Sequence, residues 1–242
     1  EDKFYIIGLS NPKNDFPYVL PGTADAWAGS VNMSGIRTQE LNILFRIKES
    51  ANYNGFKLIV DLLDTHSENP PLLKITANGH QFKYNLPKGK SDASLRGDYS
   101  AVAPSTIEVP LEDIIKSGAN RIQLKIIEGS WLIFDDIRLK GPTSAGLETL
   151  NRFAYLREVT AADYQLNDKI QPLLIDVEHL EGLPELTVKL DGKTILKQRL
   201  EKGRYNLEAP MPAVSKEKTS EYEVLVNGQP VERGKIIRSP RQ

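Results

Sequence analysis

The sequence contains no cysteine, so disulfide bonds and thiol chemistry contribute nothing to its fold or function. It also lacks any apolar run near the roughly 20 residues that are needed to cross a bilayer. Neither sign of charge is in excess, because 31 basic and 32 acidic side chains give a formal net charge of -1. The basic residues are interleaved with acidic ones, so the basic surface typical of nucleic-acid-binding proteins is absent.

Several catalytic signatures are missing as well. The sequence has no G-x-S-x-G elbow, no H-E-x-x-H motif and no phosphate-binding loop. Histidine is scarce, and neither His66 nor His80 has a second histidine at metal-ligand spacing. These absences leave open a glycosidase that uses isolated carboxylates.

Short strands separated by turns dominate the first part of the chain. Leu41–Lys48 alternates between apolar and polar residues, and Phe56–Leu63 is apolar enough for a central strand. Asn78–Gly79 predicts a hairpin with a type I′ turn. One short helical turn is expected at Leu111–Lys116, ended by Gly118. A single short helix before residue 141 favours an all-β fold, a jelly-roll β-sandwich, over an α/β fold.

A second domain follows the small, polar and proline-containing segment Gly141–Gly146. Residues 147–160 show no clear pattern, and hairpins are then predicted at Asp191–Gly192 and Asn227–Gly228. This pattern predicts an Ig-like, or fibronectin-III-like, β-sandwich without the cysteine pair of antibody domains. We therefore expect a jelly-roll domain at 1–141, an uncertain linker at 142–160 and an Ig-like domain at 161–242.

Two adjacent carboxylates stand in the predicted strand of the segment GSWLIFDDIRLKG. Strict alternation places Asp135 on the apolar face and Asp136 with Arg138 on the wetter face, unless a bulge changes the register. Two carboxylates on opposite faces of a strand cannot approach the same glycosidic bond, which argues against a catalytic pair. Asp135 is expected to have a structural role, accepting hydrogen bonds from a neighbouring loop. The alternative is a structural calcium ion, although calcium needs about six to eight oxygen ligands and no other acidic cluster stands out.

The segment Gly97–Lys140 resembles the end of a galactose-binding-like jelly roll. Its matching elements are the loop Gly97–Tyr99, the strand Ile107–Val109, the turn Ile114–Asn120 and the last strand Asp135–Leu139. This order is similar to the carbohydrate-binding-module-like domain of rhamnogalacturonan lyases of polysaccharide lyase family 4. The start of the chain, FYIIGLSNPKNDFPYVLPG, has a looser similarity to the opening of the same domain, so the resemblance covers about residues 1 to 140.

This resemblance implies the fold and a role in binding carbohydrate. The catalytic residues of those lyases lie in a different domain that has no counterpart here, so the resemblance implies no activity. In those lyases this domain comes last, whereas here an Ig-like domain follows it. The order found here is similar to the N-terminal accessory region of bacterial glycosidases akin to family 38 α-mannosidases. It implies a catalytic glycosidase or lyase domain as a partner.

Exposed aromatic rings and planar donors are the side chains expected to contact sugars. Trp27 is the foremost candidate, although it would equally suit the end of the sandwich core, and the two histidines would equally suit solvent-exposed turns. The carbohydrate-binding candidates are Trp27, Tyr53, Arg96, Tyr99, His66 and His80.

Three functions remain open from the sequence. The first is a non-catalytic carbohydrate-binding or accessory module that contacts a polysaccharide or oligosaccharide, with no nucleic acid and no membrane span. The second is a glycoside hydrolase or polysaccharide lyase acting at an inter-domain cleft, where ligand sites are common. The third is a structural or protein-interaction module without sugar binding. The expected location is secreted, periplasmic or at the cell surface, with a leader removed from the mature chain. No cofactor is expected beyond the possible calcium.

Overall fold

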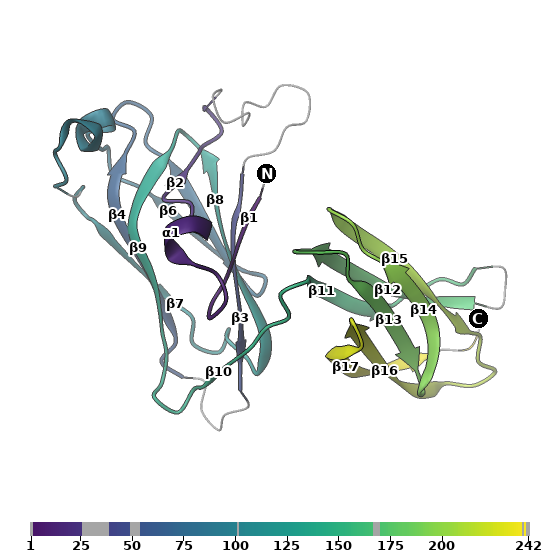
Figure 1. The fold of residues 1–242 in the computed structure, drawn as a ribbon. Coiled ribbons are helices and arrows are strands. Elements are labelled where there is room, and N and C mark those ends of the chain that lie inside the picture. The colour runs from purple at the N-terminus through teal and green to yellow at the C-terminus, as the bar shows by residue number, and fades with distance from the viewer. Residues whose placement is uncertain are drawn as a thin grey trace. The chain divides into compact units, whose positions relative to one another are not determined.

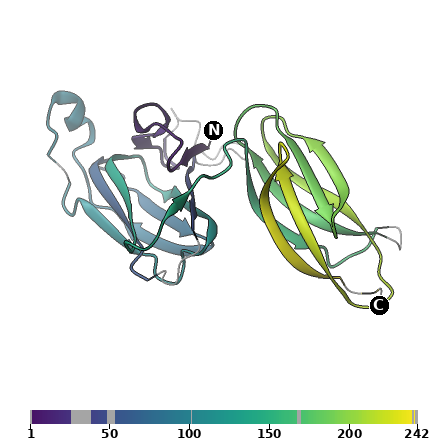
Figure 2. The same ribbon diagram turned by 60° about the horizontal axis from the view of Figure 1, so that its bottom comes forward.

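A computed structural model describes residues 2–25, 39–48, 54–100, 102–166, 170–238 and 240. The chain divides into two compact units, Glu1–Leu150 and Asn151–Gln242. The regular secondary structure of each unit is almost entirely strand (Figure 1, Figure 2). Each unit has its own apolar core. The prediction of an all-β protein made of β-sandwiches is confirmed.

Two sheets make up the first unit. One sheet has the order β1 (Lys3–Ile6), β3 (Leu41–Ile47), β8 (Gly118–Glu128), β5 (Leu72–Ala77) and β6 (His80–Asn85), with β10 (Leu147–Glu148) also paired to β3. The other sheet has the order β2 (Val19–Leu20), β9 (Leu132–Lys140), β4 (Lys57–Thr65) and β7 (Thr106–Pro110). Among the described strands of this unit, only β1 and β3 pair in parallel. Helix α1 (Pro12–Asp15) follows β1, and the 3₁₀ helix η2 (Ser91–Arg96) lies between β6 and β7.

Apolar alternation produces the core of this unit. In β8 every second side chain, Ile122, Leu124 and Ile126, is fully buried. These side chains belong to one cluster with Phe134 from the opposite sheet. Burying side chains of this size stabilises a protein by about 1.5–3 kcal/mol each relative to leaving them exposed.

A β-bulge interrupts the alternation of β9. Asp136 pairs with Asp61 of β4, whereas Phe134 pairs with the next residue, Leu62, so Asp135 is an extra residue without a partner. Phe134 is buried before the bulge, and Ile137 packs against the same core after it. The prediction that Asp135 lies on the apolar face is therefore wrong. Both adjacent carboxylates lie on the outer face, because the extra residue shifts the alternation by one position.

The three hairpin turns predicted from the sequence are confirmed. Asn78–Gly79 connects β5 to β6. Asp191–Gly192 connects β13 (Glu185–Leu190) to β14 (Lys193–Arg199), and Asn227–Gly228 connects β16 (Lys218–Val226) to β17 (Gln229–Arg238). Both residues of each pair have positive φ angles, between 44° and 92°. Asparagine, aspartate and glycine adopt this conformation at the lowest cost, and the resulting twist suits antiparallel strands.

The helix predicted at Leu111–Lys116 is instead a hydrogen-bonded turn. Asp113 has a φ of 61°, which no right-handed helix allows. The buried side chain of Asn120 stabilises this turn, donating to the carbonyl of Gly118 (2.9 Å) and accepting from the side-chain amide of Asn78 (2.7 Å). The side chain of Asn120 thus bonds to polar groups of this turn that a helix would have bonded through its backbone.

The second unit is a sandwich of three and four strands. One sheet has the order β11 (Ala154–Ala161), β12 (Ile170–His179) and β15 (Arg204–Pro212). The other has the order β14 (Lys193–Arg199), β13 (Glu185–Leu190), β16 (Lys218–Val226) and β17 (Gln229–Arg238). This is the strand arrangement of fibronectin-III-like sandwiches, in agreement with the predicted fold class. Strand β11 lies within the stretch for which the sequence showed no clear pattern.

Candidate functional site

The acidic pair of β9 belongs to a charged cluster on the outer face of the second sheet. Arg138 forms ion pairs with Asp61 and, at 3.2 Å, with Asp136. A hydrogen bond from Thr106 chiefly lowers the pKa of Asp61, whereas burial and the neighbouring Asp61 raise that of Asp136. Asp135 is exposed, and no hydrogen bond to its carboxylate from another described residue is found. Within the described ranges, no group of three or more His, Cys, Asp or Glu side chains could hold a metal ion.

A second region, which we name the loop end, lies where β4 ends and β5 and β9 begin. Three turns interlock there. The carboxylate of Asp25 accepts from the backbone N–H of Gly22 (2.6 Å) and from the hydroxyl of Ser130. The N–H of Ser130 in turn donates to the carbonyl of Asn69 (3.0 Å). A Cβ at Gly22 would lie 2.4 Å from the carbonyl oxygen of Gly129, so only glycine allows this approach.

A buried carboxylate anchors the long loop between β6 and β7. The residue Asp64 is 3% exposed. Its Oδ1 atom accepts hydrogen bonds from the backbone N–H groups of Thr65 (2.8 Å) and Lys90 (2.7 Å). The hydroxyl of Thr65 donates to the carbonyl of Pro87 (2.6 Å). Gly89 lies so close to β4 that an added Cβ would be 2.0 Å from the Thr65 carbonyl oxygen. The loop is thus fixed to the strand by hydrogen bonds and by close packing.

The same loop contains a charged cluster beside η2. The Lys90 ammonium group contacts the carboxylate of Asp98 (3.2 Å) and the carbonyl of Ser100 (3.3 Å). Hydrogen bonds from the side chain and backbone of Ser100, together with Lys90, lower the pKa of Asp98 to about 2. Asp98 therefore remains ionised at neutral pH, and its carboxylate is bound by Lys90 and Ser100.

Three of the predicted sugar-contacting side chains lie at the loop end. Tyr99 is 70% exposed, and Arg96 is exposed at the last turn of η2, where no ion pair or hydrogen bond joins its side chain to another described residue. Nδ1 of His66 accepts from the backbone N–H of Asn69 (3.0 Å), and its ring meets Trp131 edge to face with centroids 5.9 Å apart. The loops carrying His66 and η2 are joined by hydrogen bonds between Ser67 and Ser91, 2.9 Å and 2.8 Å long.

Of the three remaining candidates, the structure describes only His80. His80 is exposed in the hairpin at the far end of β5, away from the loop end, so it is not part of that surface. Trp27 and Tyr53 lie outside the described residues.

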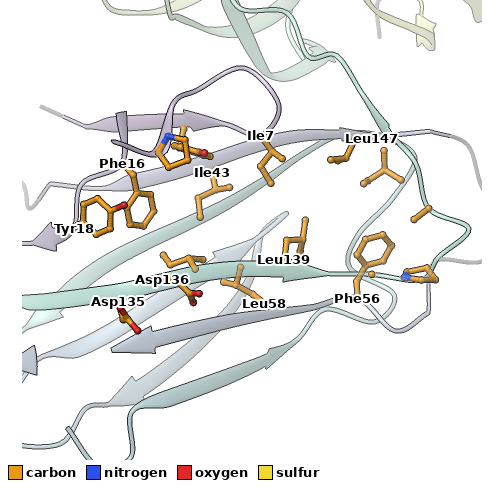
Figure 3. A pocket seen from close by; sticks show the side chains of 17 residues that line it. Ile7, Phe16, Tyr18, Ile43, Phe56, Leu58, Asp135, Asp136, Leu139 and Leu147 are labelled. Carbon is orange, nitrogen blue, oxygen red and sulfur yellow. The ribbon is translucent and has the colours of Figure 1, made fainter. Parts of the chain in front are cut away.

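Sequence reasoning missed two residues that shape the loop end, Asp25 and Asp64. Both are buried carboxylates, and their only sequence signal is an acidic residue within or directly after apolar positions. It also missed an apolar cavity at one edge of the sandwich, which Asp135 and Asp136 border. Figure 3 shows both of these side chains turned away from Leu139, which points into that cavity from the same strand.

Comparisons with known proteins identify the first unit. Residues 1–139 match the family model described as CBM-like, polysaccharide lyase family 4, domain III. No curated protein sequence matches the chain.

Solved structures with partial similarity include three glycosidases. A GH2 β-galacturonidase from Eisenbergiella tayi is 10% identical, with 81% of this chain and 34% of that chain covered and a TM-score of 0.28. An exo-chitosanase from Amycolatopsis orientalis is 11% identical, with coverage of 82% and 25% and a TM-score of 0.26. A β-glucuronidase from Ruminococcus gnavus is 8% identical, with coverage of 84% and 36% and a TM-score of 0.25. The chain therefore spans only about a quarter to a third of the length of these proteins.

Proposed function

Since this chain belongs to the CBM-like family of polysaccharide lyase family 4, domain III, we propose that it is a non-catalytic accessory module that binds a polysaccharide. The loop end of the first unit is the proposed contact surface. The observation that carries the proposal is the 70% exposure of Tyr99 on a loop that Asp64 fixes to β4. Three residues earlier in this loop, Arg96 is exposed and its side chain has no ion pair with another described residue.

The chemistry of these groups suits a sugar. A tyrosine ring offers a flat apolar surface to the C–H face of a pyranose at low entropic cost. The guanidinium of Arg96 presents planar donors that match either paired hydroxyls or the carboxylate of a uronate. Because Asp98 is held by Lys90 and Ser100, it does not neutralise Arg96 through an ion pair.

A fixed loop favours binding for a further reason. Ordering a mobile loop on binding would cost free energy, whereas a loop already held by Asp64 and by the close approach of Gly89 avoids that cost. The proposal therefore assigns the buried carboxylates a positioning role and the exposed side chains the contacts.

Affinity electrophoresis of the whole chain in gels that contain rhamnogalacturonan, polygalacturonate or neutral galactan tests this function. We expect retardation by at least one polymer, with binding about tenfold weaker in Tyr99→Ala, equivalent to a loss of about 1.4 kcal/mol. Arg96→Ala should weaken binding to the uronate polymers more than to galactan. Exposed residues of the second unit, Tyr164 and Arg199, provide matched controls as Tyr164→Ala and Arg199→Ala.

Other outcomes would favour the remaining functions. Release of oligosaccharides from any polymer would favour a lyase or hydrolase acting in its own right. If no polymer in a broad panel retards the chain, a structural or protein-interaction module is favoured. We further propose that the module works beside a catalytic glycosidase or lyase domain, in a secreted, periplasmic or cell-surface protein, because its polymers lie outside the cell. No helix in the described part of the chain is long and apolar enough to span a membrane.

A further inference from the structure

An apolar cavity of about 460 Å³ opens at one edge of the first unit. It lies between β3 of one sheet and β4 and β9 of the other, as Figure 3 shows. The interior side chains include Ile43 from β3, Leu58 from β4, Leu139 from β9, and Phe56 just before β4. Ligand pockets typically measure about 300–1,000 Å³, so this cavity is large enough for a small organic molecule.

Small residues keep the cavity open. The chain that leaves β9 crosses the edge of the sandwich at Gly141, Pro142 and Ala145, all of which line the cavity. The ring of Phe56 occupies the space that a side chain at Gly141 would take, since an added Cβ would lie 2.4 Å from it. Among the described residues of this crossing segment, little side-chain volume is therefore available to close the edge.

Three aromatic rings form the wall at the other end of the cavity. Phe16 meets Tyr18 and Tyr5 edge to face, with centroid distances of 5.0 Å and 5.9 Å. Burial and the nearby carboxylate of Asp15 raise the pKa of Tyr5. The hydroxyl of Tyr5 thus lies close to a negative charge, at the border between apolar wall and solvent.

The composition of the lining selects the kind of ligand. A sugar would bury many hydroxyl groups against aliphatic side chains, and each group without a hydrogen-bond partner would oppose binding. Asp135 and Asp136 border the cavity with their side chains turned away from Leu139, and Asp136 is paired with Arg138. No lysine, arginine or histidine lines the cavity in the described part of the chain. The carboxylates of Asp135 at the border and of Asp15 near the aromatic wall disfavour an anionic ligand.

We propose that this edge cavity binds a small amphipathic molecule with an uncharged or cationic polar end. Its ring or short alkyl chain lies between Phe16, Phe56 and Leu139, and its polar end lies at the hydroxyls of Tyr5 and Tyr18. This site is distinct from the loop end, and it does not depend on the module binding a polysaccharide.

Fluorescence titration with N-phenyl-1-naphthylamine, an uncharged apolar probe, tests the site in the whole chain. We expect one saturable site per chain, with a blue shift of emission. Decylamine and decanol should displace the probe at concentrations at least tenfold lower than decanoate. Decanoate competing equally well would overturn the charge argument, and absence of a saturable site would overturn the proposal.

Two variants assign the probe to this cavity. Ala145→Trp fills it and should weaken probe binding at least tenfold, whereas Ala213→Trp, at an exposed position of the second unit, should leave it unchanged. Leu147→Lys changes a residue that is 52% exposed at the lining, so the fold should tolerate it. It should improve competition by decanoate relative to decylamine. Probe binding that is as strong in Ala145→Trp as in Ala213→Trp, or competition by decanoate that Leu147→Lys leaves unchanged, would contradict the assignment.

Discussion

The close packing of Gly89 against β4 leads to a strong prediction. In Gly89→Ala the new methyl group would lie 2.0 Å from the carbonyl oxygen of Thr65 and 2.4 Å from Oδ1 of Asp64. One of these atoms is backbone and the other is buried, so the loop rather than the strand must move. Movement of the loop breaks the bonds from Lys90 N–H to Asp64 (2.7 Å) and from Thr65 to the carbonyl of Pro87 (2.6 Å).

The expected cost follows from these two bonds. A hydrogen bond to a charged group contributes about 1.5–3 kcal/mol and a neutral one about 1 kcal/mol, so Gly89→Ala should destabilise the first unit by about 3 kcal/mol. In a unit of about 150 residues each kcal/mol lowers Tm by about 2–4 °C, which predicts a fall of about 6–12 °C. Scanning calorimetry of the whole chain measures this fall in the transition of the first unit.

Gly146→Ala is the matched control. Neither glycine has a positive φ angle, and an added Cβ at Gly146 meets only the flexible side chain of Lys48, at 3.0 Å. This control should change Tm by less than about 2 °C, because the flexible side chain of Lys48 can move away from the new methyl group. If Gly89→Ala melts within about 2 °C of Gly146→Ala, the loop is not fixed to β4 in the way described.

Two further predictions concern the turn beside β8 and the cluster beside η2. Asn120→Ala removes the hydrogen bonds that Asn120 makes to its own turn and to Asn78, so it should cost about 3 kcal/mol in urea unfolding; a cost below about 1 kcal/mol would argue against this role. The lowered pKa of Asp98 makes the bonds from Ser100 and Lys90 stabilising above the ordinary carboxyl value of 3.8, and this stabilisation is lost as pH falls toward about 2. Hydrogen-exchange protection of the Ser100 amide, which donates to Asp98 at 3.0 Å, should fall across that pH window in the natural chain but not in Asp98→Asn. An identical pH profile in both proteins would refute this linkage.

Features decided by neighbouring residues in the chain were predictable from the sequence. The three hairpins depend on positive φ angles at adjacent Asn–Gly or Asp–Gly residues, which is a local property. The apolar alternation of β8 likewise shows directly which of its faces is buried.

Features that depend on a partner strand, or on contacts between loops distant in the sequence, were not predictable in this way. The bulge at Asp135 depends on how Asp61 and Leu62 of β4 pair across the sheet, so β9 alone does not contain the information. Asp25 acquires its role only because three turns meet at the loop end. The edge cavity depends on two sheets and on the small residues that cross between them.

Mapping of a bound oligosaccharide by amide chemical-shift changes tests the central claim most directly. On titration with oligosaccharides from a retarding polymer, we predict the largest changes at residues 64–71 and 89–100, with none at the hairpin that contains His80. Changes concentrated at that hairpin or in residues 151–242, with the loop end unaffected, would contradict the proposed binding surface.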